Sequence, residues 1–156
     1  MPTARERLRR MATEREPPSR GFAWDELMEV LGQWEDAARS PPARRGVALE
    51  DADVGALAAL VAGRGGVPLR GTVPVTHCMP PEERVQLRAL KILEDAGRLD
   101  CVRDSLARVG READAPALRE LARRLLSRLG ATGEESARAA PAPAPSGPAA
   151  RRPRRP

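Results

Sequence analysis

The apolar side chains of this chain recur at steps of three and four residues, which places them on one face of an α-helix. The clearest run is Trp24, Leu27, Leu31 and Trp34, with carboxylates between them. Aromatic residues make up only 2% of the chain and tyrosine is absent, so the residue types that favour strands are scarce. The pattern therefore predicts an all-α fold, a compact bundle of about five short helices with disordered tails.

The same pattern divides the chain into three parts. Residues 1–20 are expected to form a basic, partly helical N-terminal tail that buries little, because Leu8 and Met11 are its only apolar anchors and Pro17-Pro18 ends the helix. Residues 21–130 form the helical domain. Residues 131–156 form a disordered, basic tail rich in Ala, Pro and Arg, which lacks the apolar residues that a core requires.

Five helices are expected within the domain, near residues 23–40, 50–62, 81–96, 100–110 and 114–129. Carboxylates at their starts predict N-caps at Asp51 or Asp53, at Asp100 and at Asp114. Residues 63–79 are rich in Gly and Pro and predict a loop, with a short extended piece at residues 72–75. The helix that follows Pro80 is apolar on nearly all sides, which predicts a central position in the bundle.

The net charge of +5 is concentrated at the two ends of the chain. Residues 1–20 carry six arginines and three glutamates, residues 131–156 carry five arginines and two glutamates, and the segment between them has a net charge of −1. The basic character that would attract nucleic acid therefore lies in the tails. Since Lys91 is the only lysine, an arginine by itself carries less functional meaning in this chain than it usually does.

Residues that could carry chemistry are few. His77 and Cys78 are adjacent, and Asp100 and Cys101 lie further along the chain. A structural zinc site uses four ligands in paired short spacings, which this set does not have. Neighbouring side chains diverge, so His77 is poorly placed as a base for Cys78. The chain has no phosphate-binding glycine motif. We therefore expect no catalytic residues, no metal site and no cofactor.

The expected location is intracellular, in the nucleus or the cytoplasm. No apolar run approaches the roughly 20 residues that a membrane span requires, so we expect no membrane partner. Two cysteines in a chain without a hydrophobic signal segment indicate free thiols in a reducing compartment.

The segment from Val85 to Leu129 contains Leu87-Arg-Ala-Leu-Lys-Ile-Leu-Glu-Asp-Ala-Gly97, then Val102 and Leu106, then Asp114-Ala-Pro-Ala-Leu-Arg-Glu-Leu-Ala-Arg-Arg-Leu-Leu-Ser-Arg-Leu129. It resembles an armadillo or HEAT type helical hairpin and is similar to the last helices of the TFIIS N-terminal domain. It departs from the TFIIS pattern at Leu129, which replaces a tryptophan, and in the displaced turn Pro74-Val75-Thr76. The resemblance implies docking of unstructured peptide motifs from transcription or chromatin factors. A second resemblance, to a death-effector-like bundle, lacks that family's charged signature.

These observations favour a non-enzymatic adaptor or regulatory module that binds helices or linear motifs of partner proteins in nuclear transcription. The candidate partner-binding residues lie on the polar side of the last two helices: Arg103, Arg108, Arg111, Arg119, Arg123 and Arg124. The alternative is a nucleic-acid-binding protein that acts through its tails. In that case Arg151, Arg152, Arg154 and Arg155 bind phosphate or form an import signal. An enzyme that uses Cys78 or Cys101 is a third, less favoured class.

Overall fold

The computed structural model describes residues 1–13, 21–40, 49–63, 69–76 and 78–138, with side chains up to residue 132. Its elements in chain order are α1 (Ala4–Thr13), β1 (Phe22–Ala23), α2 (Trp24–Arg39), α3 (Asp51–Ala62), β2 (Leu69–Arg70), α4 (Pro81–Asp95), the 3-10 turn η2 (Leu99–Val102), α5 (Arg103–Glu112) and α6 (Pro116–Arg138). Within these residues the fold is all-α, as the sequence predicts, apart from one pair of two-residue strands.

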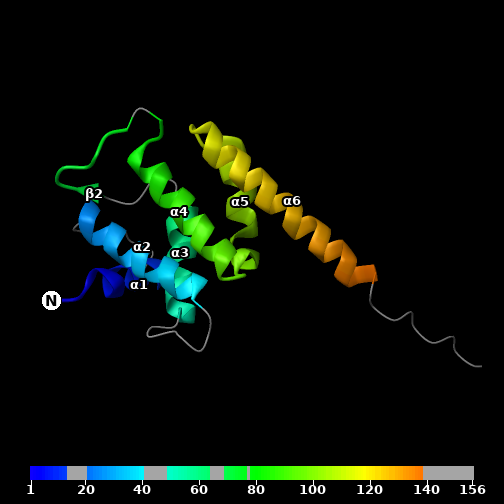
Figure 1. The fold of residues 1–156 in the computed structure, drawn as a ribbon, viewed down its shortest axis with the longest axis horizontal. Helices are drawn as coiled ribbons and strands as arrows, with labels where there is room; N and C mark the ends of the chain where they lie inside the picture. Colours follow the sequence, from blue (N-terminus) through cyan, green and yellow to red (C-terminus); the bar gives the residue numbers. More distant parts are fainter. Residues whose placement is uncertain (14–20, 41–48, 64–68, 77, 139–156) are drawn as a thin grey trace, which may run out of the picture.

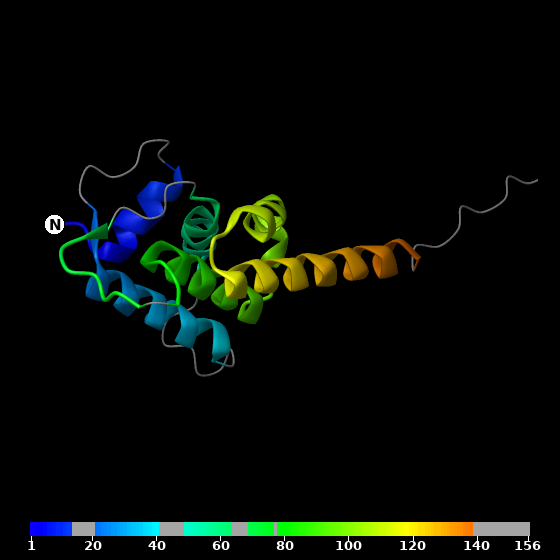
Figure 2. The same cartoon turned by 90° about the horizontal axis from the view of Figure 1, so that it is seen from above.

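The α-helices lie in two layers (Figures 1 and 2). One layer contains α1, α3 and α5, and the other contains α2, α4 and α6. Contacts between the layers are most extensive within the pairs α3–α4 and α5–α6, which are consecutive in the sequence. The consecutive pairs α3–α4 and α5–α6 therefore each span the two layers, whereas α1 packs mainly against α3.

α4 is the central helix of its layer. It contacts α2, α3 and α6, and it buries Val85, Ala89, Leu90, Ile92 and Leu93. Its central position confirms the prediction from its apolar pattern. The core continues between the layers through the largest fully buried side chains of the neighbouring helices, which include Leu27, Leu31, Trp34, Leu57, Leu60, Leu106 and Leu118.

α1 packs against the folded unit, although it buries few side chains, as the sequence predicts. Leu8 is fully buried and joins the core together with Ala4. α1 packs against α3, where Arg5 and Arg9 bond to Asp53. Apolar anchors alone underestimate the docking of this helix, because the charged contacts that hold it come from a distant part of the chain.

The extended segment lies at Leu69–Arg70 rather than at residues 72–75, where the sequence placed it. β2 pairs in parallel with β1, with Phe22 opposite Leu69. Gly71 follows directly with a φ of 74°, a backbone conformation that favours glycine. Since Phe22 is fully buried, this small pair closes the core where α2 begins.

The ends of the last helices differ from the sequence-based boundaries. Asp100 lies within η2 and does not cap α5, whose start has no side-chain cap. α5 continues past Gly110 to Glu112, and α6 continues through Gly130 to Arg138. A glycine inside a helix costs about 1 kcal/mol relative to alanine, but it does not by itself end the helix. The boundary predicted at residue 130 is therefore wrong, and the predicted disordered tail falls from residue 139 onward outside the described residues.

The start of α6 is capped from a different helix. Glu83 of α4 accepts hydrogen bonds from the backbone N–H groups of Asp114 and Ala115, at 2.6 and 2.7 Å. Both groups lie just before Pro116, the first residue of α6, and a carboxylate is favoured next to the positive end of a helix. Glu83 thus supplies a carboxylate at the start of α6, where the sequence predicted Asp114 as the N-cap.

Candidate functional site

Three of the six candidate partner-binding arginines are bonded inside the molecule. Arg108 donates to the carbonyl oxygen of Ala62 at the end of α3. Arg119 donates to the carbonyl oxygen of Ala113 at 3.1 Å, and Arg123 donates to that of Gly110 at 2.9 Å, both at the end of α5. Helix ends leave such carbonyl groups without an internal partner. The main role of these three arginines is therefore to stabilise helix ends.

Arg103 and Arg111 are different, because both are exposed and neither bonds to a described residue. They lie on α5 with Ala107 halfway between them, so all three share one side of the helix. Eight residues of α-helix span about 12 Å. Arg103 and Arg111, which we call the α5 arginine pair, thus present two guanidinium groups about two helical turns apart.

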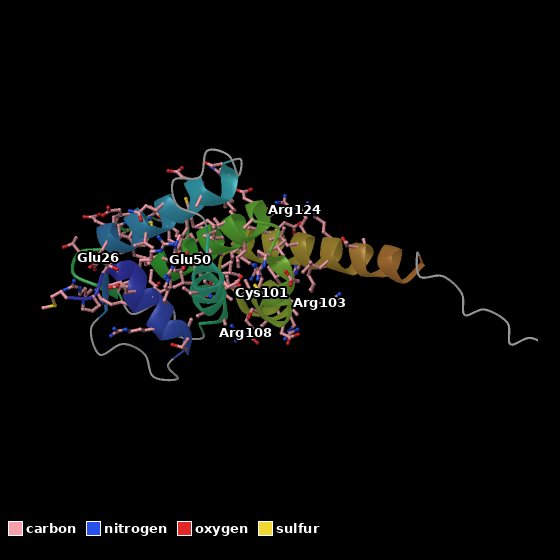
Figure 3. All side chains as sticks on the ribbon, turned by 90° about the horizontal axis from the view of Figure 1, so that it is seen from below. Glu26, Glu50, Cys101, Arg103, Arg108 and Arg124 are labelled. Carbon is pink, nitrogen blue, oxygen red and sulfur yellow. The ribbon has the colours of Figure 1, made fainter. Side chains whose placement is uncertain are left out.

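Arg124 lies away from the α5 arginine pair. It is exposed, and it precedes Arg128 by one helical turn. Arg128 forms an ion pair with Glu94 of α4, which places this side of α6 next to α4. Figure 3 shows Arg124 on the opposite side of the helical pair from Arg103 and Arg108. The six arginines therefore do not form one surface.

A cleft of about 220 Å³ opens between the end of α5 and the start of α4. Its lining includes the carboxylates Glu82, Glu83, Glu112 and Asp114, together with Arg108. Glu83 already caps α6, and Arg108 already bonds to α3. The cleft is therefore acidic, and part of its charge serves the packing of the helices around it.

Among the described residues, Cys101 has no arrangement that would activate its thiol. Cys78 and Cys101 are both exposed free thiols. Partial burial, together with the nearby carboxylate of Asp100, raises the pKa of the Cys101 thiol, whereas a nucleophilic cysteine requires a lowered pKa. His77 lies outside the described residues, as do Arg151, Arg152, Arg154 and Arg155. Among the described side chains, no three His, Cys, Asp or Glu residues are grouped so that they could hold a metal ion.

The most strongly perturbed charge of the described residues is Asp53, which sequence reasoning considered only as a helix cap. It is fully buried. Its carboxylate accepts from Arg5 at 3.0 and 2.6 Å, from Arg9 at 2.8 Å, and from the backbone N–H of Glu50 at 3.0 Å. Burial would raise the pKa of Asp53, but the bonds from the two arginines outweigh that effect and lower the pKa to about 2.

The signal for this cluster was present in the sequence in two separate places. Arg5 and Arg9 are four residues apart around Leu8, which puts both arginines beside one apolar side chain. Asp53 is the last charged residue before a run of nine apolar or glycine residues in α3. Their pairing could not be read from the sequence, because 44 to 48 residues separate the partners.

Comparisons of the chain with protein-family models, with curated proteins and with solved structures found no match. No helix among the described residues is both long enough and apolar enough to cross a membrane. A functional assignment therefore depends on the geometry of the charged clusters above.

Proposed function

We propose that this protein is a non-enzymatic protein-binding module, and that the α5 arginine pair binds an acidic segment of a partner protein. The proposal rests on a difference in hydrogen bonding among the arginines of α5 and α6. Arg108, Arg119 and Arg123 are engaged with backbone carbonyl groups, whereas Arg103 and Arg111 are exposed and bond to no described residue. Exposed guanidinium groups such as those of Arg103 and Arg111 are suited to carboxylates, which they bind with two parallel hydrogen bonds.

The magnitude of such contacts predicts a weak and salt-sensitive complex. An exposed arginine–carboxylate pair contributes about 0.2 to 1 kcal/mol, so two pairs set orientation and association rate more than affinity. The remaining affinity would come from helix faces beside α5, since stacked helical pairs commonly bind partners over an extended surface. The resemblance to armadillo, HEAT and TFIIS-type domains supports the same proposal and suggests partners in transcription inside the cell.

Three further observations favour binding over catalysis. The pKa of the Cys101 thiol is raised, which disfavours the reactive thiolate at neutral pH. The described side chains also lack a grouping that could hold a metal ion. The cleft between α4 and α5 has carboxylates that are partly committed to helix capping.

The test is a charge-reversal experiment with a matched control. The probe is a fluorescein-labelled 16-residue peptide with glutamate at every fourth position, and binding is measured by fluorescence anisotropy. The variant Arg103→Glu with Arg111→Glu is expected to bind about tenfold more weakly. The control is Lys91→Glu with Arg124→Glu, which makes the same change in net charge at exposed positions on α4 and α6. It is expected to change binding by less than about twofold. An equal loss in both variants would reject the α5 arginine pair as the binding surface.

The second candidate function, nucleic-acid binding through the arginine-rich C-terminal tail, is separated from the first by deleting residues 139–156. Binding of a 20-base-pair duplex that falls steeply with salt and disappears with this deletion supports the nucleic-acid proposal. Binding of the acidic peptide that survives the deletion supports the protein-binding proposal.

A further inference from the structure

The surface beneath α1 has a charge opposite to that of the α5 arginine pair, and it already holds a helix. We define the α1 seat as the part of α2 and α3, with the residue before α3, that carries Glu26, Glu50 and Asp53. We propose that the α1 seat is a docking site for an amphipathic helix of a partner protein with the pattern Arg-x-x-Leu-Arg, and that α1 is its built-in occupant. This inference is independent of the proposed role of α5.

Two carboxylates of the α1 seat, Asp53 and Glu50, bind the two arginines of the pattern. Arg5 binds both oxygens of Asp53, at 3.0 and 2.6 Å. Arg9 bonds to Asp53 at 2.8 Å and forms an ion pair with Glu50 at 3.2 Å. Beside them, Arg7 of α1 forms an ion pair with Glu26 at 3.3 Å. Because Asp53 is fully buried, the seat requires a cation with several fixed donors, which describes arginine better than lysine.

The pattern that fills the α1 seat is short and local. Arg5, Leu8 and Arg9 lie at positions i, i+3 and i+4, so that one helical turn presents all three side chains to α3. Leu8 and Ala4 are the residues of α1 that lie in the core, and Met11 is partly buried against the core. A segment of this length from another protein could therefore reproduce the whole contact.

The low stability of α1 as an isolated helix favours its replacement by a helix of another protein. A helix of 10 residues is marginal on its own in water, so α1 gains its structure by docking. When α1 leaves the α1 seat, water must solvate Asp53, because a buried carboxylate without a partner is strongly unfavourable. A partner helix must therefore compete with α1. Only molecules in which α1 is undocked can bind such a helix. The apparent affinity of the intact chain is therefore the intrinsic affinity multiplied by the undocked fraction.

The experiment uses the full chain and a labelled peptide of residues 2–13 as the probe. In the variant Arg5→Glu with Arg9→Glu, the chain's own α1 no longer matches the seat, and the peptide is expected to bind. The native chain is expected to bind the same peptide at least about tenfold more weakly, because its seat is occupied. A peptide with both arginines changed to lysine is expected to lose about tenfold in affinity, and adding Asp53→Asn to the variant chain is expected to abolish binding.

Three results of the peptide-binding measurement would overturn the proposal. These are equal binding to the native and variant chains, equal binding of the lysine peptide, and absence of binding to a variant chain whose circular dichroism shows a folded helical protein. Formation of dimers in place of peptide binding would assign the α1 seat to a second copy of the chain, and would also overturn it.

A second measurement covers the case in which the variant does not fold. Hydrogen exchange of the α1 amides is followed in the native chain at millimolar peptide, where displacement of α1 is expected to speed their exchange several-fold. Unchanged exchange rates would count against the α1 seat as a site that accepts another helix.

Discussion

Replacing Asp53 by asparagine is expected to destabilise the fold by about 2 to 3 kcal/mol at pH 7. The lowered pKa, from 3.8 to about 2, corresponds to about 2 kcal/mol of stability that the ionised carboxylate contributes in the folded state. Removing one member of a buried ion pair can cost 3 to 5 kcal/mol. Since Arg5 and Arg9 keep about a quarter of their side-chain surface exposed, both can turn to water in the variant, which lowers the expected cost.

The dependence on pH follows from the direction of the shift. The folded state holds Asp53 ionised at a lower pH than the unfolded state does, so the unfolded chain binds the proton first as the pH falls. The contribution of Asp53 is therefore complete above about pH 5. About half of it is lost by pH 3 and most of it by pH 2. The difference in stability between the native protein and the Asp53→Asn variant should shrink over the same interval.

Urea unfolding followed by tryptophan fluorescence measures this difference, because Trp34 is fully buried. The matched control is Asp51→Asn, two residues earlier on the same helix, where the aspartate side chain is 94% exposed and pairs with Arg98 at the surface. That variant should differ from the native protein by less than about 1 kcal/mol. Equal effects of the two variants at pH 7, or an effect of Asp53→Asn that stays constant down to pH 2.5, would refute the reasoning.

Four further predictions concern local stability and can be measured by the same urea unfolding. Glu83→Ala should cost about 1 to 2 kcal/mol, because it removes the acceptor of two N–H groups at the start of α6, whereas Glu82→Ala should cost less than about 0.5 kcal/mol. Leu8→Ala should cost about 2 to 4 kcal/mol, because Leu8 is fully buried; a cost below about 1 kcal/mol would restore the view of α1 as a loose tail. Gly55→Ala should stabilise the protein by about 0.5 to 1 kcal/mol, since an added Cβ meets nothing within 4 Å. Gly97→Ala should destabilise it, because Gly97 has a φ of 68°; a gain in stability at Gly97 would contradict that reasoning.

The sequence alone was sufficient for α2, α3 and α4. The alternation of apolar and charged residues around Trp34 predicted α2, and the proline and glycine residues at the borders of α3 and α4 marked their ends. The sequence was less reliable at Gly110 and Gly130, where the helices continue. Whether a glycine ends a helix depends on the packing that holds the flanking turns, which is not a local property.

The candidate site could be predicted only in part. The sequence identified six arginines on the last two helices, but it could not separate Arg103 and Arg111 from Arg108, which bonds to the end of α3. The partners in that bond are 46 residues apart in the sequence. The periodicity of a single helix does not predict contacts between residues so far apart. The same limit hid Glu83 as the cap of α6 and Asp53 as the centre of the α1 seat.

The sequence by itself therefore determined the helices and their apolar faces, because periodicity and backbone capping act between residues about four positions apart. Only the tertiary structure decided which charges are buried, paired or free. The energy of a charge depends on its solvent exposure and on partners brought close by packing, and Arg9 and Asp53 come into contact only after α1 and α3 have met.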